Sequence, residues 1–143
     1  MDSLEQIDSD MNKEFYFDTL DDLLSFLKEE SESNLLTEIC GFVGKKEDKL
    51  IYKQMQNRSK DPDAYFIIDA FDHLDFIKNY EMLLIFHTHL CGNEEPSDFD
   101  IKTSENCCFP FLIYSVITEK FFIYEPQYKD YDVNIIQRLK GIL

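Results

Sequence analysis

An apolar run from Met82 to Phe86 constrains the fold of this chain more than any other segment. Its length and composition predict a buried strand within a sheet. His87 and His89 end this run. Because residues i and i+2 of a strand point to the same side, both imidazoles can face one point in space.

A second pair of polar residues follows after a short connection. Pro96-Ser97 predicts the start of a helix, on which Ser97 and Asp100 occupy positions i and i+3 of one face. Two neutral imidazoles and one carboxylate suit zinc, with a fourth coordination position open to water. His87, His89 and Asp100 therefore predict a catalytic rather than a structural metal site.

A hydrolytic metal site also needs a general base. Zinc lowers the pKa of a bound water to about 7, and a base must then collect the water's proton and pass it to the leaving amine. Glu38, at the start of a glycine-containing strand predicted for 38–44, is the best candidate in the sequence.

Each part of this pattern also has an ordinary structural explanation. Ser97 followed by Asp100 resembles a helix N-cap with an acidic N3 residue. An H-x-H pair at a strand end is often a surface or core pair, and an isolated Glu38 is most often a solvated charge. His73 lies in a polar stretch of a predicted helix and is expected at the surface. The metal-site hypothesis therefore depends on the combination of residues.

Composition favours a single globular domain that binds neither nucleic acid nor a membrane. The chain has 143 residues, of which 44% are hydrophobic and 15% aromatic, enough for one packed core. A formal net charge of −15 would repel a phosphate backbone. No apolar run is long enough to span a bilayer and no secretory leader is visible, so the cytoplasm is the expected compartment.

Domain boundaries follow from the charge pattern. Residues 1–13 are polar and acidic and are expected to be flexible, whereas 14–143 form the domain. The sequence leaves the oligomeric state open. The four cysteines, Cys40, Cys91, Cys107 and Cys108, show no C-x-x-C spacing, so no disulfide framework is expected. Cys40 and Cys91 are expected to be buried or bystander thiols rather than metal ligands.

Apolar periodicity predicts strands and helices that alternate around one sheet. Strands are expected at 15–17, 38–44, 50–55, 64–68, 82–89, 109–118 and 121–124. Helices are expected at 20–27 after a Thr19 cap, at 69–79, from 97 onward and at 133–142. Such mixed elements with short connections indicate an α+β or α/β class with a central sheet.

Taken together, these residues resemble the JAMM (MPN-plus) metallopeptidase family. The family pattern is an upstream Glu, then H-x-H, seven residues and S-x-x-D, and Glu38, His87-Thr88-His89 and Ser97 to Asp100 meet it. Cys40-Gly41 and Gly44 also fit, and the segment from Gln56 to Asp69 resembles the family's second conserved block. The short prokaryotic branch is the most similar. Leu90 departs from the pattern, because family members usually carry Pro there.

The resemblance implies a fold and a role for each residue. The fold would be the cytidine-deaminase-like MPN fold, in which helices flank a central mixed sheet in three layers. His87, His89 and Asp100 would bind Zn²⁺. Glu38 would act as general base and then general acid, and Ser97 would stabilise the oxyanion.

The resemblance also implies a substrate. Family members hydrolyse the peptide or isopeptide bond after the C-terminal tail of ubiquitin or a ubiquitin-like protein, so such a protein or its conjugate is the expected substrate. Two alternatives stay open, a phage-tail or cell-wall-associated peptidase and a non-catalytic MPN scaffold. The complete set of ligands and base favours an enzyme.

Overall fold

The computed structural model describes residues 13–143, so the predicted flexibility of the acidic N-terminus lies outside the described residues. The elements are, in chain order, β1 (Glu14–Phe17), α2 (Leu20–Glu32), β2 (Cys40–Lys46), β3 (Lys49–Met55), α3 (Ala70–Asn79), β4 (Glu81–His89), α4 (Asp98–Cys107), β5 (Phe111–Ser115), β6 (Lys120–Tyr124) and α5 (Val133–Ile142).

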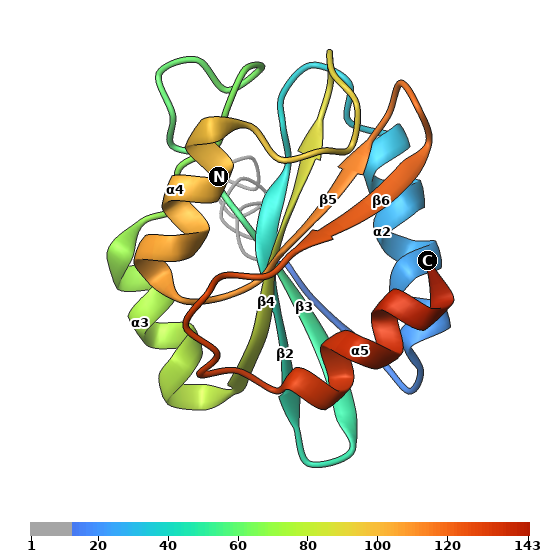
Figure 1. The fold of residues 1–143 in the computed structure, drawn as a ribbon, viewed down its shortest axis with the longest axis vertical. Coiled ribbons are helices and arrows are strands. Elements are labelled where there is room, and N and C mark those ends of the chain that lie inside the picture. The colour runs from blue at the N-terminus through green and yellow to red at the C-terminus, as the bar shows by residue number, and fades with distance from the viewer. Residues whose placement is uncertain (1–12) are drawn as a thin grey trace, which may run out of the picture.

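The strands form one mixed sheet in the order β1-β3-β2-β4-β5-β6. β4 and β5 run parallel, and the other neighbouring strands run antiparallel. Helices cover both faces of the sheet, with α2 and α5 on one side and α3 and α4 on the other (Figure 1). The predicted α+β class with a central mixed sheet is therefore confirmed.

β4 lies between β2 and β5, and both of its faces are covered. Leu84 and Phe86 belong to the core beneath α2 and α5, whereas Ile85 belongs to the core beneath α3 and α4. Burial on both faces explains the continuous apolar run of this strand. By the same alternation, His87 and His89 project toward the α3 and α4 side.

The glycines of β2 permit close packing, as the sequence predicted. A Cβ atom at Gly44 would lie 2.7 Å from the ring of Phe76 and 2.8 Å from the carbonyl oxygen of Glu81. Glycine thus lets α3 approach the strand at a distance that a side chain would prevent.

The strand predicted at 64–68 is wrong, because this segment is irregular. Phe66 packs on the rings of His87 in β4 and Phe111 in β5, so the segment lies over the face of the sheet and not beside its edge strands β1 and β6. Its peptide groups bond locally instead. The Ile67 N–H donates to Oδ1 of Asn57, and the Ile67 carbonyl accepts from the Arg58 N–H.

Two smaller expectations also need correction. The strand predicted at 109–118 is shorter, because a turn follows β5 at Val116. His73, expected at the surface, is half-buried, and its ring centroid lies 5.4 Å from that of Phe42 and 5.9 Å from that of Phe109. Cys40, Cys91, Cys107 and Cys108 are free thiols. No helix within residues 13–143 is long and apolar enough to cross a bilayer.

Candidate metal centre

The carboxyl end of β4 brings two histidines to one side of the sheet. His87 pairs with Cys40 of β2, and His89 pairs with Ser115 of β5. His87 is fully buried, whereas His89 is partly exposed at the wall of a cavity of about 600 Å³. Central placement in the sheet therefore fixes the backbone of both residues.

The N-terminus of α4 supplies the carboxylate. Ser97 is the N-cap, its Oγ accepting from the Asp100 N–H at 3.1 Å, while Oδ2 of Asp100 accepts from the Ser97 N–H at 3.0 Å. Oδ1 of Asp100 lies 3.1 Å from Nε2 of His87, and Oδ2 lies 2.9 Å from Nε2 of His89. The two sequence interpretations are thus compatible, because one Ser–Asp pair caps the helix and also aims a carboxylate at both imidazoles.

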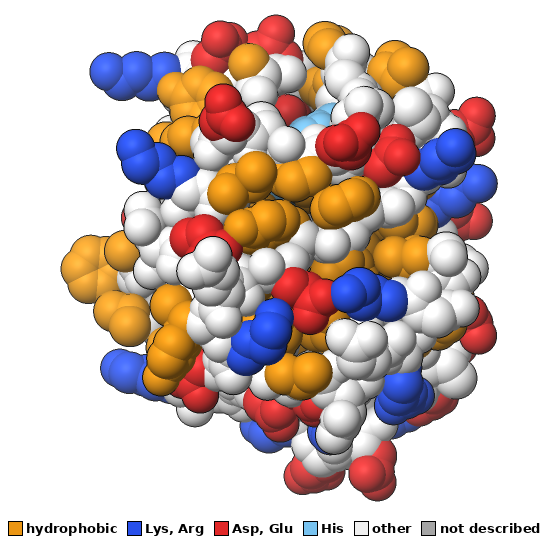
Figure 2. Space-filling model, in the orientation of Figure 1, with side chains coloured by type: hydrophobic (Ala, Val, Ile, Leu, Met, Phe, Trp, Pro, Cys, Tyr) orange, Lys and Arg blue, Asp and Glu red, His pale blue; other side chains and the backbone are white. Residues whose placement is uncertain are grey.

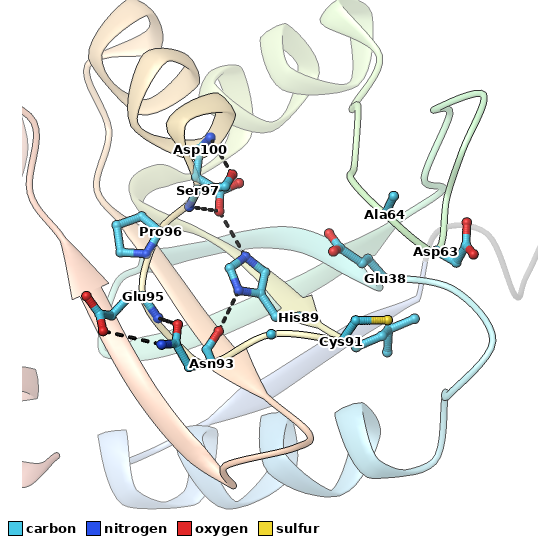
Figure 3. A pocket seen from close by; sticks show the side chains of 12 residues that line it. Glu38, Asp63, Ala64, His89, Cys91, Asn93, Glu95, Pro96, Ser97 and Asp100 are labelled. Carbon is cyan, nitrogen blue, oxygen red and sulfur yellow. Dashed lines mark hydrogen bonds and ion pairs between the residues drawn. The ribbon is translucent and has the colours of Figure 1, made fainter.

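The hydrogen bonds of His89 indicate which of its ring nitrogens carries a proton. Nδ1 of His89 lies 2.8 Å from the Asn93 carbonyl, which has no proton to donate, so Nδ1 must carry the proton. A neutral ring then turns the lone pair of Nε2 toward the Asp100 carboxylate (Figure 3). Two acceptors at 2.9 Å repel each other unless a proton or a metal ion lies between them.

Nε2 of His87 also requires a proton or a metal ion between itself and Asp100, and the side chain of His87 is fully buried. Neither of its ring nitrogens has a hydrogen-bond partner in the described part of the chain, because Nε2 is close to Asp100 without being aligned for a bond. Its ring stacks on Phe66, with centroids 4.3 Å apart. The ligand atoms of His87, His89 and Asp100 lie within 4.8 Å of one another, so this group could hold a metal ion.

Burial and mutual proximity shift the proton affinities of these groups. Burial is the main cause that lowers the pKa of His87. Burial also opposes charge on His89 and on Asp100. The proximity of the Asp100 carboxylate nevertheless raises the pKa of His89, and the proximity of His87 and then of His89 holds the pKa of Asp100 well below its usual range. Proton loss from these imidazoles is what a metal ion would require.

Glu38 reaches the same cavity from the other side. It precedes β2, only 5% of its surface is exposed, and its side chain lines the cavity together with His89 and Asp100 (Figure 3). Burial raises its pKa to about 8, with a smaller contribution from nearby Asp100. The carboxyl is therefore poised to accept and release a proton near neutral pH.

Thr88, between the two histidines, fixes the backbone beside Glu38. Its Oγ1 accepts from the Ile39 N–H at 2.9 Å, and its own N–H donates to the Ile39 carbonyl at 3.1 Å. Ser97 lines the cavity as well, and since its Oγ accepts the Asp100 N–H, its own proton is available to a ligand. All five predicted site residues, Glu38, His87, His89, Ser97 and Asp100, thus lie together.

Several residues of the site were not predicted from the sequence. Asn93 acts through its backbone carbonyl, and Phe66 acts by stacking, neither of which leaves a spacing signal. Asp63 and Ala64 form part of the cavity wall. Ala64 begins the segment 64–68, which was wrongly predicted to be a strand. Four of the residues that line the cavity carry a carboxyl group: Glu38, Asp63, Glu95 and Asp100. Figure 2 shows a histidine in a hollow near the top of the molecule, bordered by acidic side chains.

The cysteines near the site are not part of the metal group. Cys40 is buried, its Sγ contacts the Met55 carbonyl at 3.8 Å, and burial raises its pKa well above the usual range. Cys91 is exposed and lines the cavity. Neither thiol joins His87, His89 and Asp100 in the group of ligand atoms found among the described residues.

Comparison with known proteins informs the fold only. No family model and no curated protein matches the chain. Among solved structures, the solution structure of protein DSY2949 from Desulfitobacterium hafniense is similar, with a TM-score of 0.54 and 19% identity over 76% of this chain and 90% of that chain. This similarity shows a shared fold.

Proposed function

We propose that this protein is a zinc-dependent peptidase of the JAMM type, with the specific MPN arrangement of its sheet and helices. One observation carries the proposal: the Glu38 carboxyl, buried and with its pKa raised to about 8, shares a cavity with His89 and Asp100 of the group that could hold a metal. A merely structural metal site has no need of such a base beside it.

The donor set favours zinc. Two imidazole nitrogens and one carboxylate oxygen match the three protein ligands of catalytic zinc sites, whereas magnesium and calcium prefer all-oxygen sites. When bound, zinc would polarise a substrate carbonyl and lower the pKa of a water molecule. His87, His89 and Asp100 would hold it.

The residues of the chain then have distinct tasks. Glu38 takes the proton of the attacking water and delivers it to the leaving amine, so its carboxyl cycles between ionised and neutral forms. The Ser97 hydroxyl, whose oxygen accepts the Asp100 N–H, donates a hydrogen bond to the carbonyl oxygen as negative charge develops there. The Asn93 carbonyl keeps His89 in the tautomer that presents Nε2.

The proposed substrate is a ubiquitin-like protein or its conjugate, cleaved at the peptide or isopeptide bond after its C-terminal tail. Support for this class comes from the sequence resemblance. The cavity is compatible with it, because about 600 Å³ between the Leu90–Pro96 loop and residues 63–64 accommodates an extended tail.

The test combines metal analysis with hydrolysis of a linear ubiquitin–reporter fusion. Purified protein should contain about one zinc per chain, and Glu38→Gln should retain zinc while losing hydrolysis. His87→Ala should lose both. His73→Ala, which removes a half-buried histidine outside the group, should lose neither. Zinc near zero, or hydrolysis unchanged in Glu38→Gln, would rule out the peptidase. Zinc without hydrolysis would instead support a non-catalytic metal-binding scaffold.

A further inference from the structure

One amide side chain organises the loop that faces Glu38. Asn57 makes five hydrogen-bond contacts: the two protons of its Nδ2 are shared among the carbonyls of Glu38, Pro62 and Tyr65, and its Oδ1 accepts from the N–H groups of Ser59 and Ile67. The loop has no strand partner to satisfy these peptide groups, so the amide replaces a backbone ladder. Asn57 lies outside the cavity lining.

Two hydrogen bonds to this loop hold the backbone of Glu38. Its N–H donates to the Pro62 carbonyl at 2.7 Å, and its carbonyl accepts from Nδ2 of Asn57 at 3.0 Å. The next peptide is held from the opposite direction, through the reciprocal bonds between Ile39 and Thr88. Residues 38 and 39 are therefore clamped between the Asn57 loop and the strand that carries both histidines.

This clamp matters because no side-chain bond orients Glu38. Within residues 13–143 its carboxyl has no hydrogen-bond partner, although the residue is 5% exposed. The hydrogen bonds that fix this residue are therefore those of its backbone. A loss of about 1 Å in placement can cost about 100-fold in rate.

We propose that Asn57 is a positioning residue, which holds the Glu38 carboxyl over the metal-binding group through the Glu38 backbone. This assignment rests on the proposed function of the same site. The alternative is that Asn57 only stabilises its loop. The two roles differ in what the loss of Asn57 changes: a positioning role affects Glu38 and turnover but leaves the metal ligands intact, whereas a purely loop-stabilising role affects thermal stability alone.

Asn57→Asp tests this role most directly, because it keeps the shape of the side chain and replaces its N–H donors by an acceptor oxygen. We expect kcat on the ubiquitin–reporter fusion to fall about 100-fold, with KM changed less than threefold and zinc still near one per chain. In a Glu38→Gln background the same change should have no further effect on the residual rate. If Asn57→Asp does not fold, Asn57→Ala takes its place.

Ser59→Ala is the matched control. It removes the bond from Ser59 Oγ to the Tyr65 carbonyl in the same loop without touching Glu38. Its kcat should stay within twofold of wild type. Equal kcat losses in Ser59→Ala and Asn57→Asp, or an undiminished loss in the Glu38→Gln background, would overturn the positioning role.

Amide hydrogen exchange gives a readout that does not depend on activity. Protection of the Glu38 N–H, which is bonded to the Pro62 carbonyl, should fall at least tenfold in the Asn57 variant and stay unchanged in Ser59→Ala. Unchanged protection in both would refute the clamp. If the wild-type protein does not cleave the fusion, the peptidase proposal fails, and the exchange measurement still decides whether Asn57 holds the Glu38 backbone.

Discussion

Ser97 has a structural and a proposed catalytic task, and a single substitution measures both. Ser97→Ala removes the N-cap of α4, which should cost about 1 kcal/mol of unfolding free energy. It also removes the proposed oxyanion donor, so kcat should fall about 100-fold. Zinc content should stay at the wild-type level, because Ser97 is not a ligand. Urea unfolding, steady-state kinetics and metal analysis on one preparation test all three.

Thr19→Ala is the control for the cap of Ser97. Thr19 caps α2 by accepting the Asp22 N–H, on the opposite side of the sheet. Its loss should cost a similar free energy with kcat unchanged. Should Thr19→Ala slow turnover as much as Ser97→Ala, lost stability would explain both effects and the oxyanion assignment would be wrong.

Glu38 should destabilise the metal-free protein at alkaline pH. Its folded-state pKa, raised to about 8, lies above the ordinary value of 4.5, so between these values the folded state binds the proton more tightly. Stability from this group is complete below about pH 4.5 and is lost as pH rises through 8. Glu38→Gln, which cannot ionise, should therefore gain about 2–4 kcal/mol at pH 8.5 and almost nothing at pH 4.

Chelator-treated protein is the sample for this measurement, and urea unfolding at the two pH values is the method. A gain of equal size at both pH values would show that packing of the amide, and not loss of charge, stabilises the variant. A gain at pH 8.5 alone would also show that the ionised Glu38 lowers the stability of the folded protein, as expected of a base buried in a cavity.

At the scale of elements, the connection from β4 to α4 depends on β5. The buried Oγ of Ser115 donates to the Gly92 carbonyl at 2.6 Å, next to the Asn93 carbonyl that fixes His89. Ser115→Ala should loosen this loop and raise the zinc dissociation constant about tenfold, as for other groups that orient a ligand. Competition with a chromogenic chelator measures it.

Thr118→Ala is the matched comparison for Ser115. Thr118 anchors the same loop farther from His89, through an exposed bond to Glu94 at 2.7 Å. Zinc affinity should stay within twofold of wild type. Equal weakening by both substitutions would mean that general loop order, and not the Gly92–Asn93 backbone, controls His89.

The sequence predicted correctly those features that depend only on the residues of one element. The apolar run of β4 specifies burial, and strand periodicity then places His87 and His89 on one side. The cap chemistry of Ser97 and Asp100 likewise starts α4 at the predicted residue. These features are local, so they can be read from spacing.

The sequence predicted wrongly those features that depend on contacts with distant parts of the chain. Residues 64–68 have strand-like composition, but no sheet edge lies beside them, and the Asn57 amide takes the place of a ladder. The half-buried ring of His73 was predicted at the surface for the same reason, because its contacts with Phe42 and Phe109 come from distant parts of the chain. Non-local pairing leaves no periodic signal.

At the scale of the whole molecule, the metal group joins side chains from two different elements. His87 and His89 belong to the central strand, and Asp100 belongs to the first turn of α4. Without a metal, the close contact between Nε2 of His89 and the Asp100 carboxylate requires a proton on Nε2, which a bound metal ion would replace. Metal binding should therefore stabilise the entire domain, because only the folded state brings the three ligands together.

We expect zinc at 1,000 times its dissociation constant to add about 4 kcal/mol to the unfolding free energy. For a domain of this size that corresponds to a rise in Tm of roughly 10–15 °C. Differential scanning calorimetry with zinc and with chelator measures the shift. Asp100→Asn is the comparison, because its amide oxygen can still accept the Ser97 N–H while the ligand charge is lost. Its Tm should match that of the chelated wild type within a few degrees and should not respond to zinc. A zinc response of equal size in Asp100→Asn would place the stabilising metal elsewhere on this acidic molecule.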